Sequence, residues 1–241
     1  MKEMVFGRHS VLEILKAQRP VNKVLLARGV RGKGVSEIKW LARQAGVPFL
    51  WVDRKKINQL LPGKSHQGVL AFISPRSYAT MEDILHPPLE RKVFCIVDEM
   101  MDPGNLGAII RTARAFNIDA VIISRRRASP VTSTVSKASG GAVEHIPVVR
   151  VGNIVRAMER LKEMNFWSVG ADPGGEIPLE RFRFPLPLVL ILGNEEKGLR
   201  ALVKERCDFL VRIPMNKGMD SLNVSLAGGI FFYELYRQKY G

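Results

Sequence analysis

The sequence predicts an α/β protein with a small N-terminal domain and a larger C-terminal domain built on a mostly parallel sheet. Two observations support this fold class. Short apolar segments alternate with helical patterns along the whole chain, as in layered α/β folds. From residue 93 onward the apolar segments become uninterrupted, as in VFCIV (93–97) and LVLILG (188–193), which is typical of parallel strands covered on both faces.

The first 75 residues alternate between helix and strand on a small scale. Val11, Leu12 and Leu15 have helical spacing, and the second helix should end at Gly46 because glycine favours helix termini. The predicted helices are 10–18, 35–46 and 54–61, and the predicted strands are 23–27, 48–52 and 68–74. These elements predict a compact α/β unit.

The next segment, 76–92, has weak periodicity and balanced charge, and it carries Pro87 and Pro88. These features are typical of a linker. We therefore predict an N-terminal domain at 1–75, a linker at 76–92 and a C-terminal domain at 93–241.

The C-terminal part shows strands and helices in regular succession. The predicted strands are 93–97, 120–124, 166–170, 188–193 and 209–214, and the predicted helices are 105–116, 153–164 and 222–237. We expect Asn105 to cap the first of these helices, since asparagine favours that position. The adjacent Gly228 and Gly229 lie inside the last helix, where each costs about 1 kcal/mol relative to alanine, so we expect close packing there.

Composition indicates a cytoplasmic globular protein. Hydrophobic residues make up 46 % and charged residues 25 % of the 241 residues, and no apolar run is long enough for a membrane span. The N-terminal segment lacks the apolar region of a signal peptide. Cys95 and Cys207 are far apart, which predicts buried, reduced thiols, and the four histidines have no metal-ligand spacing. We expect no metal.

The net charge of +14 is concentrated near the N-terminus. Residues 1–75 contain 14 Lys and Arg against 4 Asp and Glu, whereas residues 93–241 contain 20 against 16. A basic module joined to a nearly neutral one favours a polyanionic partner, nucleic acid before a membrane surface. A solvated basic surface without a partner is the alternative.

Common nucleotide and hydrolase motifs are missing. GNEEKGL (193–199) has Leu199 where a phosphate-binding loop needs lysine, and no G-x-G-x-x-G follows a strand. No G-x-S-x-G is present either, so acyl transfer is poorly supported.

Three polar segments each follow an apolar strand, where open α/β sheets place their ligands. They are NLGAIIRTA (105–113), LILGNEEKGL (190–199) and IPMNKGMDSLNVSLA (213–227). Together they resemble the three motifs of the SpoU class of RNA ribose methyltransferases, which belongs to the knotted methyltransferase superfamily. Segments 6–15 and 136–170 are also similar to the bacterial guanosine-2′-O-methyltransferase of 23S rRNA. One departure is Lys217, which stands where the third motif has glycine.

The resemblance implies a ribosomal-protein-like RNA-binding domain at the N-terminus, a deep C-terminal trefoil knot that binds S-adenosylmethionine, and a homodimer. The last helix would pack against the second subunit, and Gly228 and Gly229 would allow that approach. The resemblance implies catalytic roles for Arg111, Asn105, Glu195, Ser221 and Asn223, and cofactor contacts at Gly193, Ile213 and Leu222.

The resemblance also implies a reaction, methylation of a ribose 2′-oxygen, with 23S rRNA or its large-subunit precursor as partner. Arg111 would bind the neighbouring phosphate and stabilise the developing oxyanion, because a guanidinium is too basic to accept the proton. Two alternatives stay open: a tRNA ribose as target, or a non-catalytic RNA-binding ribosome-assembly factor. Arg125, Arg126 and Arg127 are either an RNA contact or a solvated loop.

Overall fold

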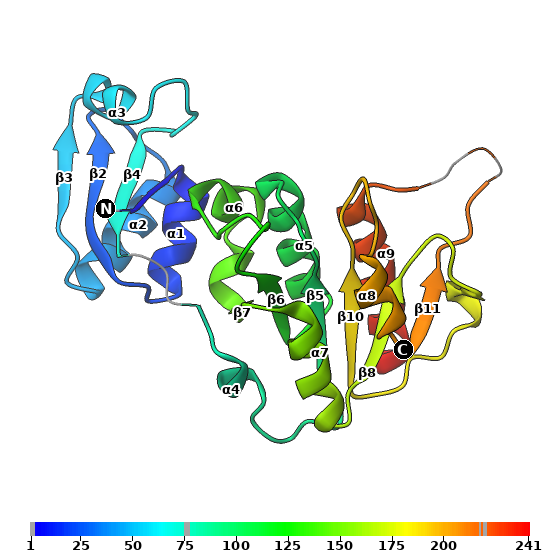
Figure 1. The fold of residues 1–241 in the computed structure, drawn as a ribbon. Coiled ribbons are helices and arrows are strands. Elements are labelled where there is room, and N and C mark those ends of the chain that lie inside the picture. The colour runs from blue at the N-terminus through cyan, green and yellow to red at the C-terminus, as the bar shows by residue number, and fades with distance from the viewer. Residues whose placement is uncertain (1–2, 75–77, 217, 219–220) are drawn as a thin grey trace. The chain divides into compact units, whose positions relative to one another are not determined.

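The computed structural model describes residues 3–74, 78–216, 218 and 221–241. Its internal contacts divide the chain into two compact units (Figure 1). Unit 1 comprises Met1–Ser77 with Val131–His145, and unit 2 comprises Tyr78–Pro130 with Ile146–Gly241. The boundaries drawn from the sequence, 1–75, 76–92 and 93–241, stay a prediction. Lys217 lies outside the described residues.

Unit 1 contains a four-stranded sheet in the order β1-β4-β2-β3, with β4, β2 and β3 side by side in Figure 1. Its strands are β1 (Glu3–Phe6), β2 (Val21–Ala27), β3 (Phe49–Val52) and β4 (Val69–Ile73). Strands β2 and β3 are parallel, and β4 runs antiparallel to both β1 and β2.

Alternating side chains give this sheet two apolar faces. Val24 and Leu26 pack with helices α1 (Arg8–Lys16) and α2 (Lys33–Gln44), whereas Leu25 and Ala27 pack with α3 (Arg54–Leu60). This is the expected consequence of the two-residue repeat of a strand. The sequence prediction missed β1, which becomes a strand through its pairing with β4.

Residues 131–145 complete unit 1 through α6 (Ser133–Ala138) and the 3₁₀ helix η1 (Ala142–His145). Arg19 pairs with Glu144 at 3.1 Å, and these side chains are only 9 % and 3 % exposed. His145 Nε2 lies 2.8 Å from Glu13 Oε2. A pair as buried as Arg19 and Glu144 needs both partners, so this segment is an integral part of unit 1.

His66 makes the stability of unit 1 depend on pH. The ring is 4 % exposed, its Nδ1 accepts the N–H of Gly68 at 3.0 Å, and Nε2 therefore donates to Asn58 Oδ1 at 2.6 Å. Burial, with a smaller contribution from the charge of Arg54, lowers the pKa of His66 from its usual 6.5. The neutral ring is the folded form, so its contribution is complete above about pH 6.5 and is lost as the pH falls through the lowered pKa.

We expect unit 1 to unfold at a lower temperature at about pH 5 than at about pH 7.5. The drop in unfolding temperature should be larger in the wild type than in a His66→Gln variant. Trp167→Phe should be made in both proteins, because the remaining Trp40 and Trp51 then report on unit 1 alone. An equal fall of the unfolding temperature in both proteins would show that His66 does not cause the pH dependence.

Unit 2 contains a seven-stranded sheet in the order β7-β6-β5-β10-β8-β11-β9, with every pair parallel. The strands are β5 (Val93–Val97), β6 (Ala120–Ser124), β7 (Val148–Val151), β8 (Trp167–Ala171), β9 (Ile177–Pro178), β10 (Leu188–Leu192) and β11 (Phe209–Arg212). Every residue of β5, β6 and β10 is buried, which confirms the prediction of a parallel sheet covered on both faces.

The helices of unit 2 are α4 (Met81–Ile84), α5 (Pro103–Ala115), α7 (Ile154–Glu163), η2 (Leu179–Arg181), α8 (Ala201–Glu205) and α9 (Val224–Tyr240). Helices α5 and α9 pack together. None of the helices among the described residues combines the length and the hydrophobicity of a membrane span. The α/β class with a mostly parallel sheet is confirmed, and the knot stays a prediction.

The structure corrects the predicted helix cap. Asp102 caps α5, not Asn105: its Oδ2 accepts the N–H of Asn105 at 2.5 Å, and Pro103 follows in the first turn. Proline suits that position because its missing N–H would have no partner there. The side chain of Asn105 is thereby free for another contact.

The expected role of the two helix glycines also changes. Gly228 is buried in its own chain, where an added Cβ would lie 2.8 Å from Leu192 Cδ1, and a Cβ on Gly229 would lie 3.6 Å from Thr112 Cγ2 of α5. Gly228 therefore lets α9 approach β10 of the same chain, and Gly229 faces α5. The prediction that this pair of glycines admits a second subunit is therefore wrong for Gly228, which its own chain covers, and stays a prediction for Gly229.

Candidate active site

The site is built at the carboxyl ends of the adjacent strands β5 and β10, where the first two motifs of the sequence lie. The backbone N–H of Asp98, directly after β5, donates to the carbonyl oxygen of Leu192, the last residue of β10, at 2.9 Å. The third motif follows β11 and leads into α9. The first motif, at 105–113, therefore meets the second and third, at 190–199 and 213–227, at the carboxyl ends of the strands.

A pocket of about 430 Å³ opens between these loops. Leu192, Val211 and Phe231 supply apolar surface, and polar groups come from the loop after β10. Five of the eight predicted site residues line it: Gly193, Glu195, Ile213, Ser221 and Leu222. The three residues predicted to contact a cofactor thus share one cavity.

Glu195 links the pocket to two further predicted residues. Its Oε2 accepts the side-chain N–H of Asn105 at 2.7 Å, and its Oε1 accepts that of Asn223 at 2.6 Å. Asn223 Nδ2 also lies 3.0 Å from Asn105 Oδ1. One residue from each motif therefore takes part in a closed hydrogen-bonded cluster.

Asn223 is held by the helix that it caps. Its Oδ1 accepts the backbone N–H of Ser225 at 2.9 Å and the Ser225 hydroxyl at 2.6 Å, which fixes the N-terminus of α9. Because the oxygen is used there, the amide nitrogen must face Glu195. The cap therefore orients the cluster.

Arg111 stands apart from these residues. It lies exposed on α5 and does not line the pocket. No described residue forms a hydrogen bond or an ion pair with its side chain. Within one chain the structure brings together seven of the eight predicted residues and leaves the predicted central one outside.

Gly193 is needed for the shape of the loop after β10. A Cβ there would overlap the backbone of Gly198 and Leu199. The turn is closed by two backbone hydrogen bonds between Asn194 and Gly198, and Asn194 Oδ1 accepts the N–H groups of Glu196 and Lys197. Sequence reasoning missed the contribution of Asn194, although its place next to Gly193 was a usable signal.

An ion pair between a buried aspartate and an exposed arginine beside the loops was also missed. Asp98 is 1 % exposed, and Arg200 binds it with two hydrogen bonds, Nε to Oδ2 at 2.8 Å and Nη2 to Oδ1 at 2.7 Å. The bond to Asp98 raises the pKa of Arg200. The pair ties the end of β5 to the start of α8. An aspartate directly after an apolar strand was the available signal.

The cysteines do not line the pocket. Cys95 and Cys207 are free, and burial, with the nearby Asp208 and Asp172, raises the pKa of Cys207 to about 12. Among the described residues, no group of three or more His, Cys, Asp or Glu side chains could hold a metal ion.

Comparison with known proteins identifies the family to which the chain belongs. The profile of the SpoU rRNA Methylase family matches residues 92–233, and a profile described as RNA 2′-O ribose methyltransferase substrate binding matches residues 4–79. YacO of Bacillus subtilis (strain 168), whose name assigns it to the TrmH family of tRNA/rRNA methyltransferases, is 41 % identical over 241 residues, covering 98 % of this chain and 96 % of YacO.

Two solved structures are informative. An AdoMet-bound rRNA methyltransferase from Sinorhizobium meliloti is 27 % identical with a TM-score of 0.82, and the match covers 98 % of this chain and 87 % of that one. A TrmH/SpoU tRNA modifying enzyme from A. aeolicus is 26 % identical with a TM-score of 0.56, and the match covers 62 % of this chain and 77 % of that one. The chain belongs to the SpoU rRNA Methylase family and is an RNA methyltransferase of the SpoU/TrmH type.

Proposed function

We propose that this protein methylates the ribose 2′-oxygen of a guanosine in 23S rRNA, or in its large-subunit precursor, with S-adenosylmethionine as methyl donor. The observation that carries the proposal is the pocket at the three motifs, joined through Glu195 to Asn105 and Asn223. The pocket itself is lined by residues of the second and third motifs, and Asn105 of the first motif joins it through Glu195.

The pocket residues fit S-adenosylmethionine. A volume of about 430 Å³ is in the range of small-molecule sites, and Leu192, Val211 and Phe231 offer apolar surface for an adenine ring. Backbone groups at Gly193, Ile213 and Leu222 would hold the adenosine part. The S. meliloti neighbour was crystallised with the same molecule. We propose that these residues lie in a knotted segment.

When bound, the donor supplies an electrophilic methyl group: its sulfur–carbon bond breaks, an oxygen–carbon bond forms, and the 2′-hydroxyl proton is released. Arg111 binds the adjacent RNA phosphate and stabilises the developing negative charge on the 2′-oxygen. It does not take the proton, because a guanidinium stays protonated. Asn105, Glu195, Ser221 and Asn223 position the ribose.

We further propose that the working form is a cytoplasmic homodimer in which Arg111 of one subunit serves the pocket of the other. Two observations support this. Arg111 is exposed and lies outside the pocket of its own chain. Leu226, Ile230 and Tyr233 form an exposed apolar stripe along α9, with Leu226 61 % and Tyr233 54 % exposed. A second copy would cover such a stripe.

Mixed dimers test this arrangement. A heterodimer of one Arg111→Ala chain and one Glu195→Ala chain should have one intact site, because a wild-type Arg111 then meets a wild-type Glu195. We expect roughly half of the wild-type rate from the heterodimer, isolated through two affinity tags, and almost none from either parent. An inactive heterodimer would rule the arrangement out. So would a wild type that light scattering shows to be a monomer and that still methylates RNA.

The choice of rRNA rests on the N-terminal region. The rRNA methyltransferase of S. meliloti matches 98 % of this chain, whereas the tRNA modifying enzyme of A. aeolicus matches only 62 %. Residues 1–75, with 14 basic and 4 acidic residues, would bind the larger RNA.

The test is to map ribose methylation on rRNA and tRNA from cells with and without the gene. We expect one 23S rRNA guanosine to lose its 2′-O-methyl group. Loss at a tRNA position would make tRNA the substrate. No loss at any ribose, together with no binding of S-adenosylmethionine in calorimetry, would point to a non-catalytic RNA-binding factor.

A further inference from the structure

Unit 1 carries a hollow of its own at the carboxyl ends of the parallel strands β2 and β3. Its volume is about 530 Å³. It is lined by the loop 28–32 after β2, by Val35, Ser36 and Lys39 of α2, and by Trp51 of β3. None of the predicted site residues lies in it.

Trp51 forms an unusual wall for a surface hollow. It is 42 % exposed and lies on the edge strand of the sheet, where only β2 pairs with β3. Lys39 Nζ lies 5.6 Å from the centre of the indole ring. An exposed indole next to a cation is a surface on which a nucleic-acid base stacks.

The rest of the hollow is positively charged. Arg28 and Arg31 are exposed in the loop, and no carboxylate of the described chain pairs with either of them or with Lys39. Other basic residues of unit 1 do have partners: Lys16 binds Glu37 at 3.0 Å. The lining therefore offers three unneutralised cations to an anion.

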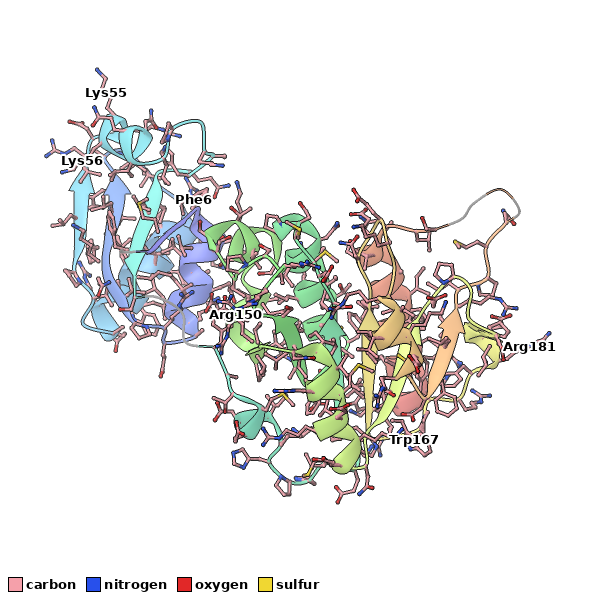
Figure 2. The ribbon with its side chains drawn as sticks, viewed as in Figure 1. Phe6, Lys55, Lys56, Arg150, Trp167 and Arg181 are labelled. Carbon is pink, nitrogen blue, oxygen red and sulfur yellow. The ribbon has the colours of Figure 1, made fainter. Side chains whose placement is uncertain are left out.

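More positive charge surrounds the opening. Arg8 Nη1 lies 3.3 Å from the place where a Cβ on Gly32 would stand, so its guanidinium is next to the loop. Because β2 and β3 are parallel, α3, which follows β3, begins at the same end of the strands as the hollow. Its first turn carries Arg54, Lys55 and Lys56. Figure 2 shows Lys55 and Lys56 projecting outward from α3.

We infer that this hollow binds one unpaired nucleotide of the RNA substrate, with the base stacked on Trp51 and the phosphate held by Arg28, Arg31 and Lys39. The inference rests on the proposed function for the identity of the ligand as RNA. A base inside a duplex already has both faces stacked, so only an unpaired base can offer a face to Trp51. The volume suits a single nucleotide.

Tryptophan fluorescence tests the stacking directly. The chain has three tryptophans, and Trp40→Phe with Trp167→Phe leaves Trp51 as the sole indole. Single-stranded RNA of about 12 nucleotides should quench Trp51 strongly, and an RNA duplex of equal length should quench it much less. Binding is followed in parallel through the anisotropy of labelled RNA. Unchanged Trp51 emission at saturating single strand would overturn the inference.

The matched control is Trp40, which is 60 % exposed but does not line the hollow. A protein with Trp40 as its sole indole should show little quenching. Trp51→Ala should weaken single-strand binding roughly tenfold and Trp51→Phe less, because phenylalanine keeps a stacking face, whereas Trp40→Ala should have almost no effect. Equal losses for Trp51→Ala and Trp40→Ala would contradict the assignment.

The charged residues give a second readout. Arg31→Ala should reduce the slope of log affinity against log salt by about 0.7, the value for one phosphate contact on a single strand. Lys16→Ala, which removes a cation already paired with Glu37, should change the slope less.

These readouts do not depend on methyl transfer. Quenching by RNA in a protein that methylates nothing would support the hollow and refute the proposed function. Methylation without quenching would support the function and refute the hollow.

Discussion

Replacing Arg111 by alanine should abolish methyl transfer to RNA while leaving binding of S-adenosylmethionine nearly unchanged. The separation follows from position, because Arg111 lies exposed on α5 and does not line the pocket that would hold the donor. Removing a guanidinium that binds the RNA phosphate and stabilises the developing charge on the 2′-oxygen lowers the rate of methyl transfer without a matching loss of donor affinity, because neither contact involves the donor. Single-turnover methylation and calorimetry measure the two quantities.

Arg114→Ala is the matched control, since Arg114 is also exposed and lies one turn further along α5. It should keep most of the activity. If Arg111→Ala retained more than about a tenth of the wild-type rate, less than about 1.4 kcal/mol would have been lost, too little for the central residue. An ionisation assigned to Arg111 below about pH 9 in the pH–rate profile would contradict its role as a permanent cation.

Replacing Gly193 by alanine should remove S-adenosylmethionine binding. An added Cβ would overlap the backbone of Gly198 and Leu199, and backbone cannot move aside as a flexible side chain can. The turn of residues 193–198 must then open, and it forms one wall of the pocket. We expect at least a tenfold loss of affinity in calorimetry, about 1.4 kcal/mol, with methyl transfer lost in parallel.

Gly152→Ala serves as the control in the same unit. Gly152 follows β7 at the same edge of the sheet, and an added Cβ would meet nothing within 4 Å. Its donor affinity should equal that of the wild type. If Gly193→Ala bound the donor within twofold of the wild type, the pocket after β10 would not be the donor site.

Much of the fold can be predicted from the sequence, because the strongest local patterns match the burial of those residues in the structure. The apolar runs at 93–97, 120–124 and 188–192 are all fully buried strands. A strand covered on both faces must be apolar at every position, so its sequence alone identifies it. Short elements such as β1 and β9 carry too few residues for a pattern and become strands only through a neighbour.

The motif residues were also recognisable in the chain, since the type and spacing of Asn105, Glu195 and Asn223 are local properties. Their hydrogen bonds are not, because they join residues 28 to 118 positions apart. The cap of α5 shows the same difference: Asp102 and Asn105 both favour a cap, and only the path of the chain before the helix selects Asp102.

Contacts between distant parts of the chain decide the features that local sequence does not predict. Whether Gly228 faces a partner or its own sheet depends on where Leu192 lies, and whether Arg111 meets the pocket depends on how α5 is turned. The alternation of helix and strand, the basic N-terminal third and the motif residues follow from local sequence, where each residue's chemistry is enough. The pocket, the Asp98–Arg200 pair and the hollow at Trp51 require folding, because each is made of groups that only chain packing brings within contact distance.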